Sequence, residues 1–168
     1  MLFALLSAAL AEAPTDCGTV EPTVPDFALQ DLNPGSATYT QSLGPQDFRD
    51  KTLIVYWASA SCGVCQSHAA ALQEIWDEQT DWHADTQILL VNGIGYESYL
   101  PNFTAALSLP VLQDVTDVQA FSTYGASKWY VYFVDHDGTL RWLHYSLDLG
   151  NTERQRFIDE VDGLRGEQ

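Results

Sequence analysis

The sequence predicts an α/β fold: a central mixed β-sheet, built as a βαβ unit followed by a ββα unit, flanked by helices and preceded by an N-terminal extension. Residues 52–58 and 86–95 are almost continuously apolar, as in strands buried on both faces. The segment between them, 62–78, repeats apolar residues at helical spacing. Two aromatic-rich runs near the C-terminus are joined through Asp137-Gly138, which is a strong hairpin signal.

The first residues, 1–11, are apolar and small and end in Ala9-Leu10-Ala11, which fits a signal-peptide cleavage site. They lack the usual leading Lys or Arg, and they are too short to span a bilayer. A disordered apolar tail is the alternative interpretation. We therefore expect a signal segment over 1–11, an extended Pro-, Asp-, Thr- and Gly-rich lead-in over 12–36, and one domain over 37–168. The expected location is the periplasm or cell envelope, with no stable membrane span after processing.

Within the domain the patterns predict elements in a fixed order. The apolar face of the first helix reads Cys65, Ala69, Leu72, Ile75 and Trp76. The predicted elements are an edge strand at 37–40, a strand at 52–58, a helix at 62–78, a strand at 86–95, helices at 97–107 and 116–124, strands at 129–135 and 139–145, and a helix at 151–166. The expected core sheet has four strands.

The chain is strongly acidic, with 23 acidic and 7 basic residues and a formal net charge of -16. Nucleic-acid binding and attachment to an anionic membrane both need a basic surface, so neither is expected. Charge of this kind favours solubility, and that is the preferred interpretation. Steering of a cationic redox partner is the alternative.

Three cysteines are present, and two of them, Cys62 and Cys65, form a C-x-x-C motif, while Cys17 is left over. A zinc site would need a second pair or suitably spaced histidines, so no metal or other cofactor is expected. C-x-x-C beside a βαβ pattern indicates a thioredoxin-like redox motif. Cys62 falls at a helix start, where the dipole favours a thiolate, so Cys62 is the expected nucleophile and Cys65 the resolving thiol.

The segment YWASASCGVC (56–65) resembles the FWA-x-W-C-x-x-C segment of the thioredoxin superfamily. With VPDFALQDLN, LPVLQD and YFVDHDGTL, the wider pattern is similar to the exported TlpA/ResA-type thioredoxins and the related AhpC/TSA (redoxin) group. The resemblance covers about residues 22–165. It implies a thioredoxin-like fold and thiol–disulfide exchange through Cys62 and Cys65, with protein thiols or disulfides or small thiols as partners.

Several positions depart from that family. The slot of its cis-proline, which shapes the substrate groove, falls at Trp129 or Tyr130, so these two residues are expected groove residues with trans peptide bonds. Ser61 replaces a tryptophan. The buried aspartate of thioredoxin corresponds to about Val55. His68 stands where relatives often carry glutamate, and a histidine there could accept the Cys65 proton. A partly exposed histidine without a role is the alternative.

Two other activities fit parts of the pattern. A peroxiredoxin-like peroxidase reads P-x-x-x-T-x-x-C, and the matching positions hold Val55 and Ser59, so the serine is acceptable and the proline is missing. A Sco-like copper-binding protein uses C-x-x-x-C with a distant histidine. Here the cysteine spacing differs, although His136 or His144 could supply the imidazole.

Overall fold

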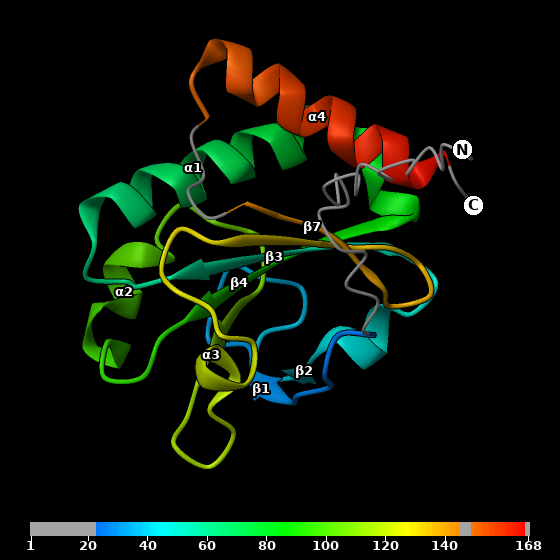
Figure 1. Ribbon diagram of the computed structural model, residues 1–168. Helices are drawn as coiled ribbons and strands as arrows, with labels where there is room; N and C mark the ends of the chain where they lie inside the picture. The colour runs from blue at the N-terminus through cyan, green and yellow to red at the C-terminus, as the bar shows by residue number, and fades with distance from the viewer. Residues whose placement is uncertain (1–22, 145–148, 167–168) are drawn as a thin grey trace, which may run out of the picture.

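The protein is described here from a computed structural model (Figure 1), which describes residues 23–144 and 149–166. The expected signal segment, Cys17 and the first part of the lead-in lie outside the described residues.

One mixed sheet of five strands forms the centre of the molecule, in the order β5-β4-β3-β6-β7. β3 (Thr52–Ala58) pairs in parallel with β4 (Thr86–Asn92), which pairs in parallel with β5 (Val111–Gln113). On the other side, β3 is antiparallel to β6 (Val131–Val134), and β6 is antiparallel to β7 (Leu140–His144). The predicted mixed sheet and hairpin are therefore confirmed.

Two layers cover the sheet. α1 (Gly63–Glu78) and α4 (Asn151–Arg165) lie together on one face (Figure 1). The other face carries the short helix α3 (Ala120–Thr123) and the two-stranded sheet of β1 (Leu29–Gln30) and β2 (Ser42–Leu43). Helices on both faces agree with the prediction, and they explain why the central strands are apolar on both sides.

The remaining elements are short. They are the 3₁₀ turns η1 (Pro45–Phe48), η2 (Thr80–Ala84) and η3 (Glu97–Tyr99), and the helix α2 (Leu100–Phe103). The helix expected over 97–107 is therefore much shorter, with its proline in the first turn, where a missing N–H costs nothing. Among the described residues, no helix has the length and apolarity that a membrane span needs.

Side chains of β3 alternate between the two layers. Ile54, Tyr56 and Ala58 pack in the cluster that includes α1 and α4, whereas Val55 and Trp57 pack in the cluster on the opposite face. Successive side chains of a strand point to opposite faces, so a shift of one residue changes the layer. Val55, the expected counterpart of the buried aspartate, therefore lies in the layer opposite α1 and Cys65, whereas Tyr56 lies in the same layer as α1.

Two other predictions also need correction. Residues 37–40 form a turn rather than an edge strand, and Thr40 has a left-handed φ of 68°. The sheet has five strands rather than four, because Val111–Gln113 extends it beyond β4. Buried Asp31 joins both features, since its carboxylate accepts hydrogen bonds from the Thr38 hydroxyl (2.8 Å) and the Val111 N–H (3.0 Å).

Candidate redox site at the start of helix α1

Cys62 and Cys65 lie where the chain leaves the central strand and enters α1. Cys62 is the N-cap residue, and its Sγ accepts a hydrogen bond from the Cys65 backbone N–H at 3.3 Å. Cys62 is partly exposed, whereas Cys65 is fully buried one turn further on. Both are free thiols. An exposed sulfur at a helix N-terminus with a buried sulfur behind it is the arrangement that an attacking and a resolving thiol require.

The two thiols differ in their protonation. Burial opposes ionisation of Cys62. Its interactions with the Cys65 side chain and N–H, with the Trp129 side chain and with the charge of Lys128 together hold its pKa below the ordinary thiol value. Burial, followed by the hydrogen bond to Cys62, raises the pKa of Cys65, although a backbone contact at Ser59 and the Tyr56 side chain act in the opposite direction. Cys62 is therefore the thiol that ionises first.

The loop before Cys62 is held by hydrogen bonds from both sides, and the buried side-chain amide of Asn92 supplies those on the β4 side. Asn92 Oδ1 accepts a hydrogen bond from the Ala60 N–H at 2.7 Å, and Asn92 Nδ2 donates to Gln113 Oε1 at 2.6 Å. From above, Gln66 Nε2 donates to the Ala60 carbonyl at 2.9 Å. The cysteine loop is thus tied to β4 and β5 through side chains. Sequence reasoning missed Asn92, for which a polar residue at the end of an apolar strand was the available signal.

His68 approaches the cysteines through a tyrosine. Its Nδ1 lies 3.3 Å from the Tyr56 hydroxyl oxygen, and the two rings meet edge to face with centroids 6.2 Å apart. Burial and the neighbouring Cys65 raise the pKa of Tyr56, so the phenol stays protonated. A neutral phenol can both donate and accept, which lets Tyr56 link Cys65 with His68. Tyr56 was not among the predicted site residues.

The expected groove residues Trp129 and Tyr130 lie beside the site but belong to different layers. Trp129 packs with Cys62 against the α1 side of the core, whereas Tyr130 packs against the opposite cluster. Their backbones pair with β3, since the Trp129 N–H donates to the Trp57 carbonyl at 2.8 Å and the Trp57 N–H donates to the Tyr130 carbonyl at 2.9 Å. All peptide bonds of the described residues are trans, as expected at Trp129.

A cavity of about 620 Å³ opens near the same end of the sheet. It extends between the ends of β3 and β4 and the helix α3, and Ser59, Ile94, Phe121 and Lys128 are among its lining residues. Ser59 precedes Cys62 in the pinned loop. A partner's side chain therefore has space beside the candidate site.

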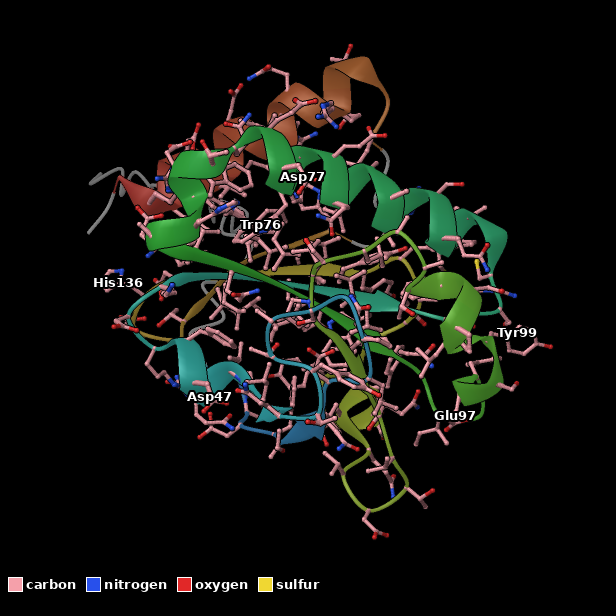
Figure 2. The ribbon with its side chains drawn as sticks, turned by 180° about the vertical axis from the view of Figure 1, so that it is seen from behind. Asp47, Trp76, Asp77, Glu97, Tyr99 and His136 are labelled. Carbon is pink, nitrogen blue, oxygen red and sulfur yellow. The ribbon has the colours of Figure 1, made fainter. Side chains whose placement is uncertain are left out.

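Neither of the two histidines considered as copper ligands joins the cysteines in a cluster of metal-ligand side chains within the described residues. His136 is in the turn between β6 and β7. In Figure 2 it lies at one end of the molecule, whereas the start of α1 lies at the other end, on the side of Glu97 and Tyr99. His144 lies on the edge strand, with Nε2 3.0 Å from Glu160 Oε2. Within the described residues, no group of three or more His, Cys, Asp or Glu side chains is placed to hold a metal ion.

The residues matched to the peroxidase motif are also split. Val55 faces the layer opposite Cys65, and the Ser59 hydroxyl lies 3.0 Å from the Ser61 hydroxyl. These two positions therefore do not form, around Cys62, the pocket that the proline and threonine of the peroxidase motif would form.

Comparison with protein families decides the affiliation. The AhpC/TSA family model matches residues 20–143, which is most of the chain. The chain belongs to the AhpC/TSA family. This match begins within the lead-in and ends in β7, so it includes the five strands and the cysteine pair. A search of curated proteins found no match.

Solved structures share the fold of this AhpC/TSA member at low sequence identity. A Chlorobium tepidum protein described as thiol:disulfide interchange protein DsbE has 16% identity and a TM-score of 0.71, covering 86% of this chain and 96% of its own. The exposed lipoprotein thioredoxin of Streptococcus pneumoniae has 22% identity and a TM-score of 0.62, covering 81% and 99%. The thioredoxin domain of a Bacteroides vulgatus thiol-disulfide oxidoreductase has 14% identity and a TM-score of 0.62, covering 83% and 94%. The thioredoxin-like fold is thereby established.

Proposed function

We propose that the protein is a thiol:disulfide oxidoreductase in which Cys62 attacks and Cys65 resolves. The observation that carries the proposal is the pairing of a partly exposed thiol of lowered pKa, at the N-cap of α1, with a buried thiol of raised pKa one turn on. Membership of a redoxin family supports redox chemistry in general. The proposed partners are protein disulfides or thiols, or small thiols.

Reduction of a partner proceeds in two exchanges. The Cys62 thiolate attacks one partner sulfur, a mixed S–S bond forms, the partner's S–S bond breaks, and its second sulfur leaves as a thiolate that takes up a proton. Cys65 then loses its proton and attacks Cys62 Sγ, so that the Cys62–Cys65 bond forms and the mixed bond breaks. The partner gains two electrons and two protons in total. Oxidation of a dithiol partner is the same sequence reversed.

The proposed role of His68 is to accept the Cys65 proton through Tyr56. As Cys65 attacks, the Tyr56 hydroxyl takes the thiol proton while giving its own proton to His68 Nδ1, 3.3 Å away. A positioned base of this kind typically accelerates a proton-coupled step by about 10²–10⁴-fold. Trp129 and Tyr130 are proposed to border the partner's docking site, beside the cavity that contains Ser59 and Lys128.

A trapping experiment tests the proposal directly. Cys65→Ser should retain a mixed disulfide at Cys62, which can be identified by non-reducing electrophoresis and peptide mass spectrometry, whereas Cys62→Ser should retain none. Equilibration of the native protein in glutathione buffers should give one two-electron midpoint for the Cys62–Cys65 pair. If no disulfide forms between these two cysteines at any potential, the proposal fails.

Peroxide reduction is the alternative activity, and the family match is the observation that favours it. Both activities need Cys62, so loss of activity in Cys62→Ser does not distinguish them. Stopped-flow mixing of the reduced protein with hydrogen peroxide does. Oxidation of Cys62 far faster than that of a free thiol would replace the oxidoreductase proposal with a peroxidase.

We further propose that the chain is exported. The apolar, small residues 1–11 with Ala9-Leu10-Ala11 support this, and a structurally similar protein is an exposed lipoprotein. Expression of the full chain with a C-terminal tag, followed by cell fractionation and N-terminal sequencing, tests it. Processing after Ala11 with recovery in the periplasmic fraction is expected, and an intact N-terminus in the cytoplasmic fraction would contradict it.

A further inference from the structure

Lys128 differs from the arginines of this acidic chain. Each of the five arginines makes an ion pair within the described residues: Arg49 with Asp26, Arg141 with Asp135, Arg154 with Glu78, Arg156 with Glu160 and Arg165 with Asp85. Lys128 is in none of the ion pairs found in the described part of the chain. Its ammonium instead lies over the indole ring of Trp129, 5.1 Å from the ring centroid.

The sequence on either side of the nucleophile contains no carboxylate, and Asp114 lines the same cavity as Lys128. From Thr52 to Gln73 the chain contains no Asp, Glu, Lys or Arg, and the first turn of α1 has no acidic residue. The positive end of that helix is therefore not offset by a nearby acid on the helix itself. The titratable groups that act on Cys62 are Cys65 of α1, Tyr56 of β3 and Lys128, which precedes β6.

Trp129 is held in a costly arrangement. Its φ of 80° is left-handed, which is uncommon for a bulky residue and costs on the order of 1–3 kcal/mol. Its indole N–H is buried and has no hydrogen-bond partner of good geometry within the described residues. Buried donors are nearly always paired, so an unpaired one at an active site calls for a ligand or a charge. Trp129 and Cys62 pack against the same core cluster, and the Trp129 side chain contributes to the lowered pKa of Cys62.

We propose that Trp129 and Lys128 form an anion clamp for Cys62, in which the indole N–H donates a hydrogen bond to the thiolate and the lysine supplies the positive charge. The clamp deepens the proposed function and rests on it, since it names the groups that make Cys62 the attacking sulfur. The indole N–H has no other partner within the described residues, and a hydrogen bond to a charged sulfur is stronger than one to a neutral thiol. Its interaction therefore favours the thiolate selectively.

The position of Lys128 strengthens the same donor. A cation over the ring face is attracted to the negative π surface of the indole. It draws electron density from the ring and leaves the N–H more positive. Lys128 thus acts on Cys62 both directly, through its charge, and through Trp129. In this role Trp129 contacts the reacting sulfur, and Lys128 is a positioning and polarising residue.

The decisive experiment measures the pKa of Cys62 from the pH dependence of iodoacetamide alkylation. It uses a Cys65→Ser background, with Cys62 modification quantified by peptide mass spectrometry so that Cys17 does not contribute. Trp129→Phe keeps an aromatic ring and removes the N–H, and we expect the Cys62 pKa to rise by about one unit. Alkylation well below the pKa should slow by about tenfold. Trp142→Phe, on β7, is the matched control and should change neither.

Lys128→Met should raise the same pKa by a smaller amount, and salt separates the two contributions. The Lys128 contribution should shrink in 1 M NaCl, because the ammonium is exposed and screened. The Trp129 contribution should persist, because the N–H carries no net charge. A folded Trp129→Phe protein with an unchanged Cys62 pKa would overturn the clamp.

A second measurement needs no substitution at Trp129. In the ¹⁵N-labelled protein, the Trp129 indole N–H resonance should shift downfield as Cys62 ionises, and it should not titrate in Cys62→Ser. An indole signal that ignores Cys62 would also overturn the clamp. Neither readout requires a partner or a Cys62–Cys65 disulfide, so failure of the clamp is distinguishable from failure of the proposed exchange activity.

Discussion

The Tyr56 hydroxyl oxygen lies 3.3 Å from His68 Nδ1, and the Tyr56 side chain also acts to lower the pKa of the buried Cys65 thiol, against the larger effect of burial. One phenol thus joins the resolving cysteine to a partly buried histidine. In the proposed mechanism, this relationship makes the second exchange step, rather than the first, the step that depends on Tyr56 and His68.

Tyr56→Phe should slow the resolving step selectively. Reaction with Ellman's reagent releases one thiolate when Cys62 attacks and a second when Cys65 resolves, so stopped-flow absorbance separates the two phases. We expect the second phase at pH 7 to slow by about 10²-fold, near the lower end of general-base effects, and the first phase to change little. Tyr132→Phe is the control, because its hydroxyl donates to the Tyr124 carbonyl on the opposite layer. Equal slowing of both phases would refute the relay.

His68→Gln separates hydrogen bonding from proton transfer. Glutamine can still hydrogen-bond to Tyr56 but cannot accept a proton near neutral pH. The second Ellman phase should therefore slow about as much as in Tyr56→Phe, and the double variant should be no slower than either single variant. His83→Gln, in η2 beyond the C-terminal end of α1, should behave as wild type. Additive losses in the double variant would show that the two residues act separately.

Removal of the Asp31 carboxylate should destabilise the fold. Asp31 is fully buried and accepts hydrogen bonds from the Asn33 and Val111 N–H groups and the Thr38 hydroxyl. Asp31→Ala leaves three donors without this acceptor, so a loss of about 3 kcal/mol in unfolding free energy is expected from urea denaturation. Asp47→Ala removes an exposed carboxylate that accepts from the Gly44 N–H and should cost about 1 kcal/mol or less. Equal losses would contradict the argument from burial.

Arg165 should stabilise the protein in a pH-dependent manner. Its guanidinium contacts both carboxylate oxygens of Asp85 at 2.7 and 3.1 Å, and these contacts lower the pKa of Asp85. A folded-state pKa below the unfolded value stabilises the fold above that unfolded value, about 3.9, and the contribution is lost as pH falls through the folded-state pKa.

Arg165→Met should accordingly reduce unfolding free energy by about 1–2 kcal/mol at pH 7, and the deficit should narrow below about pH 4. Urea denaturation across this pH range measures it. Arg156→Met, which removes a largely exposed pairing along α4, is expected to cost at most about 0.5 kcal/mol at any pH. A deficit for Arg165→Met that is independent of pH would indicate lost packing instead.

Long apolar patterns made the sheet centre and α1 predictable, because burial on both faces leaves a continuous signal at 52–58 and 86–92. The cysteine pair was predictable from its place between strand and helix. β5 was not, since three residues carry no periodicity and owe their strand state to pairing with β4. Tyr56 was not predicted for a related reason. Where both faces of a strand are apolar, the sequence shows no alternation of polar and apolar residues that would indicate which side chain faces the cysteines.

The conformation of Trp129 was equally hidden from sequence. Nothing in its neighbours demands a left-handed tryptophan, and its unpaired N–H depends on how β3, β6 and α1 meet in space. Asn92 is an intermediate case. The sequence shows a polar residue at the end of an apolar strand, but its hydrogen bond from the Ala60 N–H depends on the tertiary structure.

The run from Thr52 to Gln73 contains no Asp, Glu, Lys or Arg. The net charge of the whole protein therefore differs from the charge of the sequence around Cys62. Asp47 and His136 lie at the end of the molecule opposite the start of α1 (Figure 2). Substitutions that change the charge at that end should alter the solubility of the protein with little effect on the pKa of Cys62, because salt screens exposed charges that lie far from the thiol.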